Sequence, residues 1–130
     1  MTAAKVLLID DDADFVRIHA AYLKAAGFTV VSAVDGDEGL AVARQENPDV
    51  VILDYMMTRP TEGSIVAIEM REDPQLKSIP IILLTSVRAR HPWWGVQKNE
   101  SHLPVDILLD KPVPPERLID EVRRLVEKKA

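Results

Sequence analysis

The sequence has no cysteine, and no apolar run within its 130 residues approaches the roughly 20 residues of a membrane-spanning helix. The lack of cysteine excludes disulfides, thiolate catalysis and zinc–thiolate sites. There is no excess of positive charge either: the formal net charge is −5, which argues against electrostatic binding to nucleic acid. The first five residues lead into an apolar run and resemble neither a signal peptide nor an anchor, so we expect a cytoplasmic protein without membrane partners.

What the sequence does contain is a set of short apolar runs rich in valine, isoleucine and leucine, at 6–9, 50–53, 81–84 and 107–109. Continuous runs of this length indicate strands of a parallel sheet that is buried on both faces. Each run is closely followed by residues able to handle a phosphoryl group, namely Asp10 and Asp11, Asp54, Thr85 and Lys111. Because ligands bind at the carboxyl ends of parallel strands, we expect these residues to meet at one edge of the sheet.

Amphipathic segments alternate with the predicted strands. The first is expected to form a helix that ends at Gly27, with an apolar stripe of Phe15, Ile18, His19, Tyr22 and Leu23. A further strand is expected at 28–31, helices at 37–45 and 63–71, and a last helix opened by Pro114 and Pro115. Five such β/α units predict a single α/β domain with an open, five-stranded parallel sheet.

The predicted edge would bring three carboxylates together. Two of them about 5 Å apart repel by roughly 3 kcal/mol at an effective dielectric constant near 20. A hard cation among Asp10, Asp11 and Asp54 would relieve this repulsion, and Mg²⁺ prefers one or two carboxylates together with water and phosphate oxygens. The hydroxyl of Thr85 and the ammonium of Lys111 both suit phosphate oxygens. This combination is typical of phosphoryl transfer to a carboxylate nucleophile.

Four segments give the chain a specific resemblance, at 5–12, 48–57, 80–86 and 110–112. They read KVLLIDDD, PDVVILDYMM, PIILLTS and DKP, in this order and each at a predicted strand end. Together they resemble a response-regulator receiver domain of two-component signalling. The resemblance implies a flavodoxin-like strand order 2-1-3-4-5 with helices on both faces, and residues 1–130 as one receiver domain without an output domain.

The resemblance also implies roles for the acidic residues. Asp54 is the expected phosphoacceptor, which takes its phosphoryl group from a sensor histidine kinase or a phosphotransfer protein. Asp11 and Asp54 would bind Mg²⁺ directly with the backbone carbonyl of Met56, while Asp10 would support the metal through water. Catalysis would be limited to the protein's own phosphorylation and dephosphorylation, so the chain is not expected to be a conventional enzyme.

The remaining roles fall to the last two strand ends. Lys111 would bind a phosphoryl oxygen, and Thr85 would move toward the phosphoryl group to signal its presence. The Lys111–Pro112 peptide bond is expected to be cis. The signal would pass to a downstream protein that the sequence does not identify, and a homodimer through the surface of the last helix is compatible with the family.

The sequence departs from the family pattern in three places. The loop after the acceptor, residues 58–63, has Pro60 and Gly63 displaced as if one residue had been inserted. Leu108 stands three residues before the lysine, where the family usually has an aromatic residue, so we expect an altered threonine–aromatic relay. The stretch from 85 to 111 is longer than usual and carries Pro92-Trp93-Trp94. Met56 and Val87 flank the expected site of hydrolysis and cannot activate water, which predicts slow self-dephosphorylation.

Two alternatives remain open. The altered loop and Leu108 are compatible with a receiver fold that acts as a docking module independent of phosphorylation. The DDDAD segment at 10–14 loosely matches the nucleophile motif of a haloacid-dehalogenase-type phosphatase, although Asp54 would then have no role. Helix capping is an alternative role for the early aspartates, and it is the favoured role for Asp12.

Overall fold

The computed structural model describes residues 3–55, 62–85 and 104–129. Five strands pair in parallel into one sheet with the order β2-β1-β3-β4-β5. Their bounds are Lys5–Ile9 for β1, Thr29–Ala33 for β2, Val50–Asp54 for β3, Ile81–Thr85 for β4 and Ile107–Asp110 for β5. The predicted flavodoxin-like order 2-1-3-4-5 is therefore confirmed.

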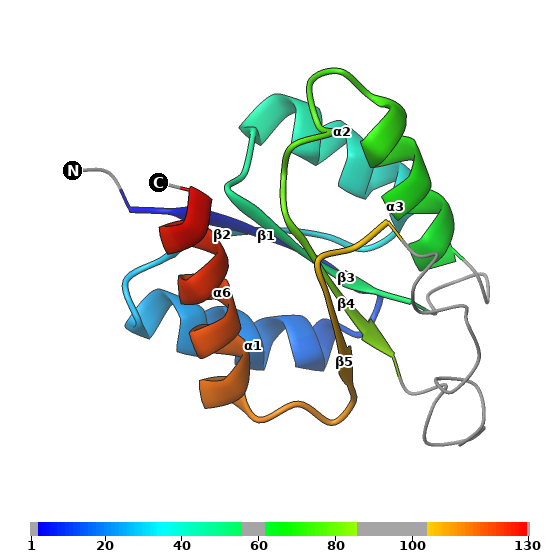
Figure 1. The fold of residues 1–130 in the computed structure, drawn as a ribbon. Coiled ribbons are helices and arrows are strands. Elements are labelled where there is room, and N and C mark those ends of the chain that lie inside the picture. Colours follow the sequence, from blue (N-terminus) through cyan, green and yellow to red (C-terminus); the bar gives the residue numbers. More distant parts are fainter. Residues whose placement is uncertain (1–2, 56–61, 86–103, 130) are drawn as a thin grey trace.

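Helices cover both faces of this sheet, as predicted. Within the described residues they are α1 (Ala13–Ala25), α2 (Gly36–Glu46), α3 (Glu62–Glu72) and α6 (Pro115–Lys129). In Figure 1, α1 and α6 lie on one face and α2 and α3 on the other. None of the helices that the structure describes has the length and apolar character needed to cross a bilayer.

The core is split into two layers because successive side chains of a strand point to opposite faces. Val6 and Leu8 of β1 pack in the cluster under α1 and α6, whereas Leu7 and Ile9 pack in the cluster under α2 and α3. Every residue of β3 and β4 is buried, which confirms the prediction for these runs.

The run at 107–109 differs from the other three. Leu109 is buried, but Ile107 and Leu108 are only half-buried, so the expectation of a strand buried on both faces is wrong here. The physical reason is the position of β5, which pairs only with β4 and forms one edge of the sheet.

The apolar stripe predicted for the first helix also needs correction. His19 and Leu23 are buried, while Ile18 and Tyr22 are 46% and 50% exposed. The buried face is rotated around the helix away from Ile18 and Tyr22 and toward Val16 and Ala20. The buried face of α1 is centred on His19 and Leu23, with Phe15, Val16 and Ala20 packed beside them.

Candidate functional site

The carboxyl ends of the strands bring the predicted residues together. Asp10 directly follows β1, Asp54 ends β3, and Lys111 directly follows β5. One carboxylate oxygen from each of Asp10, Asp11 and Asp54 lies within 4.8 Å of the others. Asp10 and Asp54 are buried, with 2% and 7% of their surface exposed, whereas Asp11 is exposed.

Backbone hydrogen bonds fix the two buried aspartates. The backbone N–H of Asp10 donates to the carbonyl of Ala33 at 3.1 Å, which continues the pairing of β1 with β2. After β3, the N–H of Tyr55 donates to the carbonyl of Leu84 at 2.8 Å. The positions of the carboxylates are therefore set by the sheet itself.

Gly63 brings α3 against the strand that carries Asp54. Its N–H donates to the carbonyl of Tyr55 at 3.0 Å. A Cβ at Gly63 would lie 2.3 Å from the carbonyl oxygen of Asp54 and 2.6 Å from the Cα of Tyr55, so the contact leaves no room for a side chain. Although it is displaced in the sequence, Gly63 provides a close approach between helix and strand.

Asp12 caps α1, as predicted. Its Oδ1 accepts hydrogen bonds from the N–H groups of Asp14 and Phe15 at 3.0 and 3.1 Å. Asp10 has a different role: its Oδ1 accepts from the N–H of Asp12 at 2.9 Å, while its Oδ2 faces Lys111. Capping therefore accounts for Asp12 and leaves one oxygen of Asp10 for the site.

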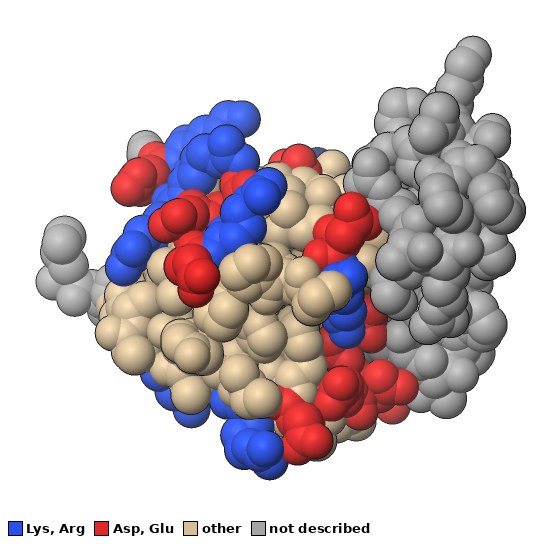
Figure 2. Space-filling view, turned by 90° about the horizontal axis from the view of Figure 1, so that it is seen from below, with Lys and Arg blue, Asp and Glu red and all other residues tan. Residues whose placement is uncertain are grey.

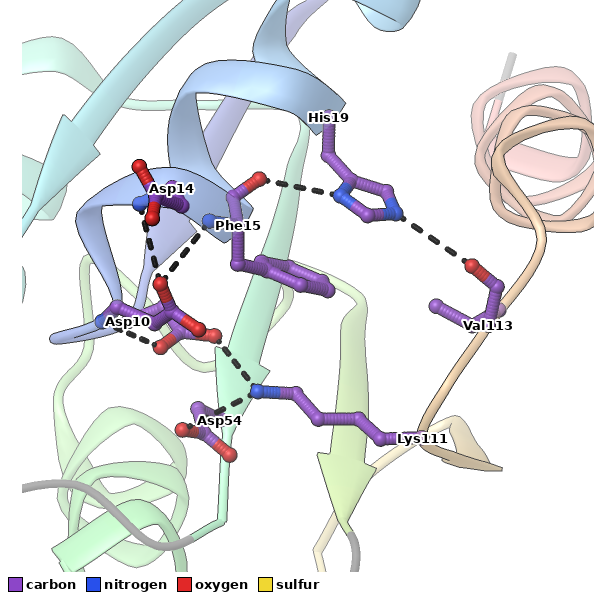
Figure 3. A network of polar contacts seen from close by, with 8 residues as sticks. Asp10, Asp14, Phe15, His19, Asp54, Lys111 and Val113 are labelled. Atoms are coloured by element: carbon purple, nitrogen blue, oxygen red, sulfur yellow. Dashed lines mark hydrogen bonds and ion pairs between the residues drawn. The ribbon is translucent and has the colours of Figure 1, made fainter.

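Lys111 links the two buried aspartates. Its Nζ donates to Oδ2 of Asp10 at 3.0 Å and lies 3.4 Å from Oδ2 of Asp54, as Figure 3 shows. Burial alone would lower the pKa of Lys111, but the hydrogen bond to Asp10 and the charges of Asp54 and Asp10 outweigh it and raise this pKa above its usual value. The side chain is therefore an ammonium at neutral pH.

The backbone around Lys111 is equally well defined. Its N–H donates to the carbonyl of Thr85 at 2.8 Å, which joins the ends of β4 and β5. The Lys111–Pro112 peptide bond is cis, as predicted. Thr85 itself is fully buried at the end of β4.

Phe15 and His19 of α1 lie beside the lysine, an arrangement that sequence reasoning missed. The Nζ of Lys111 lies 4.4 Å from the centroid of the Phe15 ring, a distance typical of a cation–π contact. The imidazole of His19 stacks on the same ring with the centroids 3.9 Å apart. One signal for this contact was available in the sequence: Phe15 lies in the first turn of α1, directly after the predicted cap Asp12 and the site residues Asp10 and Asp11.

The charges of the site fit a divalent cation. Asp10, Asp11 and Asp54 offer three carboxylates, which Lys111 compensates only in part, and oxygen donors are what Mg²⁺ prefers. Figure 2 is turned about the horizontal axis of Figure 1, so the right-hand side, toward which β1, β3 and β4 run, is the same in both views. On that side of the described residues, Figure 2 shows a group of acidic side chains (red) with Lys or Arg atoms (blue) among them.

Several predicted features lie outside the described residues, namely Met56 and its carbonyl, the loop at 58–61, Val87 and Pro92-Trp93-Trp94. Leu108 is described. It pairs with Leu83 of β4 and packs, half-buried, against the core layer under α2 and α3. The altered relay that we expect from Leu108 stays a prediction.

The chain resembles a large group of signalling proteins. Residues 6–123 match the family described as the response regulator receiver domain. The probable transcriptional regulator ycf27 of Guillardia theta is 44% identical over 86 residues, which cover 66% of this chain and 32% of that protein. Response regulator PleD of Caulobacter vibrioides is 35% identical over 88 residues, which cover 68% of this chain and 19% of that protein. The matched part thus spans about a third or less of these relatives.

Solved structures agree with this likeness. The receiver domain of the Francisella response regulator 1452 superposes with a TM-score of 0.85 at 25% identity, covering 98% of this chain and 99% of that one. The chemotaxis response regulator CheY4 of Vibrio cholerae gives a TM-score of 0.82 at 31% identity, covering 95% of this chain and 99% of that one.

Proposed function

Because this chain belongs to the response-regulator receiver family of two-component signalling, we propose that Asp54 accepts a phosphoryl group from a sensor histidine kinase or a phosphotransfer protein. We further propose that this phosphorylation switches a surface that a downstream protein binds. The family match also argues against the phosphatase alternative that the segment at 10–14 left open. The protein would act as a signalling module that catalyses only its own phosphorylation and dephosphorylation.

One observation carries the assignment of Asp54. Its carboxylate lies at the carboxyl end of a central strand, within 4.8 Å of an oxygen from each of two other carboxylates and 3.4 Å from the ammonium of Lys111. The site thus supplies a carboxylate nucleophile, further carboxylates able to hold a divalent cation and a positive charge for phosphoryl oxygens, which together suit phosphoryl transfer to an aspartate.

Asp11 and Asp54 would hold Mg²⁺, with Asp10 beside them. When bound, the ion supplies positive charge to the oxygens of the incoming phosphoryl group. The chain's own contribution is to fix these carboxylates before any ligand arrives, through the strand pairing of Asp10 and the close contact of Gly63 with the backbone of Asp54. Such preorganisation avoids the cost of rearranging dipoles during the reaction.

In the transfer, a carboxylate oxygen of Asp54 forms a bond to phosphorus while the bond from phosphorus to the donor's histidine nitrogen breaks. That nitrogen keeps the bonding electron pair. Lys111 lies where the oxygens of the transferred group bring additional negative charge, and its ammonium offsets that charge without any proton transfer. Thr85 ends the neighbouring strand, so we expect its hydroxyl to respond to the new group.

The output would be a shift between two conformations that already exist in equilibrium. The half-buried Leu108 lies in β5, on the strand that leads directly to Lys111. Movement of Lys111 or Thr85 toward a phosphoryl group would therefore reach the β5 edge. We propose the cytoplasm as the location of this switch, and a homodimer through the surface of α6 as one assembly compatible with the family.

Intact-mass spectrometry tests the proposal. The protein is incubated with Mg²⁺ and acetyl phosphate and compared with Asp54→Asn, which removes the nucleophile but keeps the shape of the side chain. We expect the mass of one phosphoryl group on the wild type, lost both on chelation of Mg²⁺ and in Asp54→Asn. The matched control is Asp14→Asn, at an exposed aspartate of α1 outside the carboxylate cluster.

No mass gain in a folded wild type that binds Mg²⁺ would overturn the proposal and leave a docking module independent of phosphorylation. A gain that persists in Asp54→Asn would place the acceptor at another residue. Either result is read directly from the mass spectrum and from a peptide map of the phosphorylated protein.

A further inference from the structure

We propose that His19 is a positioning residue for Lys111 and sets the rate at which Asp54 accepts a phosphoryl group. This inference rests on the proposed function. The imidazole does not touch the carboxylates; it acts through Phe15 and through the backbone just after Lys111. Figure 3 shows both connections, with His19 and Lys111 on opposite sides of the Phe15 ring.

The first connection is the ring stack. The imidazole and the Phe15 ring are 3.9 Å apart at their centroids with 20° between their planes, and the Nζ of Lys111 lies 4.4 Å from the centroid of the same ring. Phe15 is only half-buried, and the imidazole of His19 covers one face of its ring. A ring held in place in turn restricts where the ammonium rests.

The second connection is to the backbone. The Nε2 of His19 lies 3.4 Å from the carbonyl oxygen of Val113, two residues beyond Lys111 and just after the cis peptide bond. This contact joins α1 to a segment 94 positions later in the chain. It adds to the hydrogen bond between Lys111 N–H and the carbonyl of Thr85, so the Lys111–Val113 segment is held at both ends.

The chemistry of the imidazole distinguishes this role from plain packing. His19 is 8% exposed on a helix face otherwise buried through apolar side chains, a place where leucine would fill the space without polar atoms. Both of its ring nitrogens face carbonyl oxygens, since Nδ1 lies 3.1 Å from the carbonyl of Phe15. A neutral imidazole donates to one of these carbonyls and an imidazolium to both. The imidazolium, or the neutral ring with its proton on Nε2, therefore ties α1 to a neighbour of Lys111.

Three substitutions separate the two connections. His19→Leu removes both the ring stack and the donor. His19→Phe keeps an aromatic ring against Phe15 but loses the donor, and His19→Gln keeps a donor toward Val113 but loses the ring. The matched control is Ile18→Ala, at an exposed neighbouring position on the same helix.

The measurement is the rate of phosphoryl uptake with acetyl phosphate at saturating Mg²⁺, followed by intact mass over a range of donor concentrations. We expect His19→Leu to lower the rate at saturating donor roughly tenfold, since misplacing a reacting group by 1 Å costs up to about 100-fold. His19→Phe and His19→Gln should each fall between His19→Leu and wild type. The Mg²⁺ affinity should stay unchanged, because no carboxylate of the site contacts His19, and Ile18→Ala should match wild type.

A double-mutant cycle identifies the route through Lys111. In a Lys111→Met background, His19→Leu should cause no further loss, because the group it positions is gone. Equal rates for His19→Leu and wild type, or the same fold-loss in both backgrounds, would overturn the inference. Loss of phosphoryl uptake by the wild type itself would instead remove the proposed function. Circular dichroism checks that each variant is folded, and Phe15→Leu tests the same route if His19→Leu does not fold.

Discussion

The two halves of the site are held in different ways. The carboxylate half sits at the ends of β1 and β3, central strands whose residues are almost entirely buried and paired on both sides. The lysine half follows β5, an edge strand that pairs on one side and whose first two residues are half-buried. The backbone of Lys111 is held by β4, but its long side chain is positioned by contacts with Asp10, Asp54 and Phe15. The carboxylates thus lie close to a doubly paired backbone, whereas the ammonium depends on side-chain contacts.

This difference predicts unequal costs for truncating a leucine on either side. Leu53 precedes Asp54 and is completely buried, so we expect Leu53→Ala to lower the free energy of unfolding by about 2–5 kcal/mol. Leu108→Ala, at a half-buried position, should lower it by only about 1–2 kcal/mol. Urea unfolding followed by circular dichroism measures both.

The comparison of the two halves would fail if both leucine variants lost the same free energy. Ile18→Ala is the control, because it removes a side chain of the same size from an exposed position. Its free energy of unfolding should stay close to that of wild type.

Mg²⁺ should stabilise the carboxylate half selectively. At a free concentration one hundred times its dissociation constant, a ligand of the folded state adds about 2.7 kcal/mol to the free energy of unfolding. We expect Asp11→Asn to abolish most of this gain with little change in the metal-free protein, because Asp11 is exposed. Lys111→Met should keep the gain, since it removes a competing cation rather than a ligand.

Thermal unfolding at increasing Mg²⁺ concentration gives this result, with Asp14→Asn as the control for a carboxylate outside the cluster. A gain that survives Asp11→Asn in full would show that the ion binds elsewhere.

The smallest expected effect concerns alkaline pH and the lysine half. The pKa of Lys111 is raised in the folded state, so its ion pairs contribute fully below its unfolded value of about 10.5 and are lost as the pH rises through the higher folded value. We expect the free energy of unfolding of wild type to fall more steeply above pH 10.5 than that of Lys111→Met. Parallel curves of urea stability against pH would contradict this.

Much of this arrangement could be predicted from the sequence. Continuous apolar runs predicted the central strands, and the polar residue after each run predicted the site, because parallel strands present their carboxyl ends at one edge. The cap at Asp12 followed from the preference of aspartate for helix starts. These features depend on local patterns that a single sequence records directly.

What could not be predicted depends on the tertiary arrangement. A run of apolar residues does not reveal that β5 lies at an edge, so its partial exposure was missed. The apolar stripe on α1 does not show which side of the helix faces the sheet, so it wrongly predicts that Ile18 and Tyr22 are buried. The contacts of Phe15 with Lys111 and of His19 with Val113 join positions nearly a hundred residues apart, a distance at which local periodicity carries no information.

The ion pair between Lys111 and Asp10 also bears on the order of events in folding. It joins residues 101 positions apart, so it requires that the segments carrying β1 and β5 both be in place. Contacts between such distant positions are slow to form because a long loop must close first. During synthesis, a chain that has folded only its early strands would carry the carboxylates without their lysine. The complete site thereby depends on nearly the whole domain being folded.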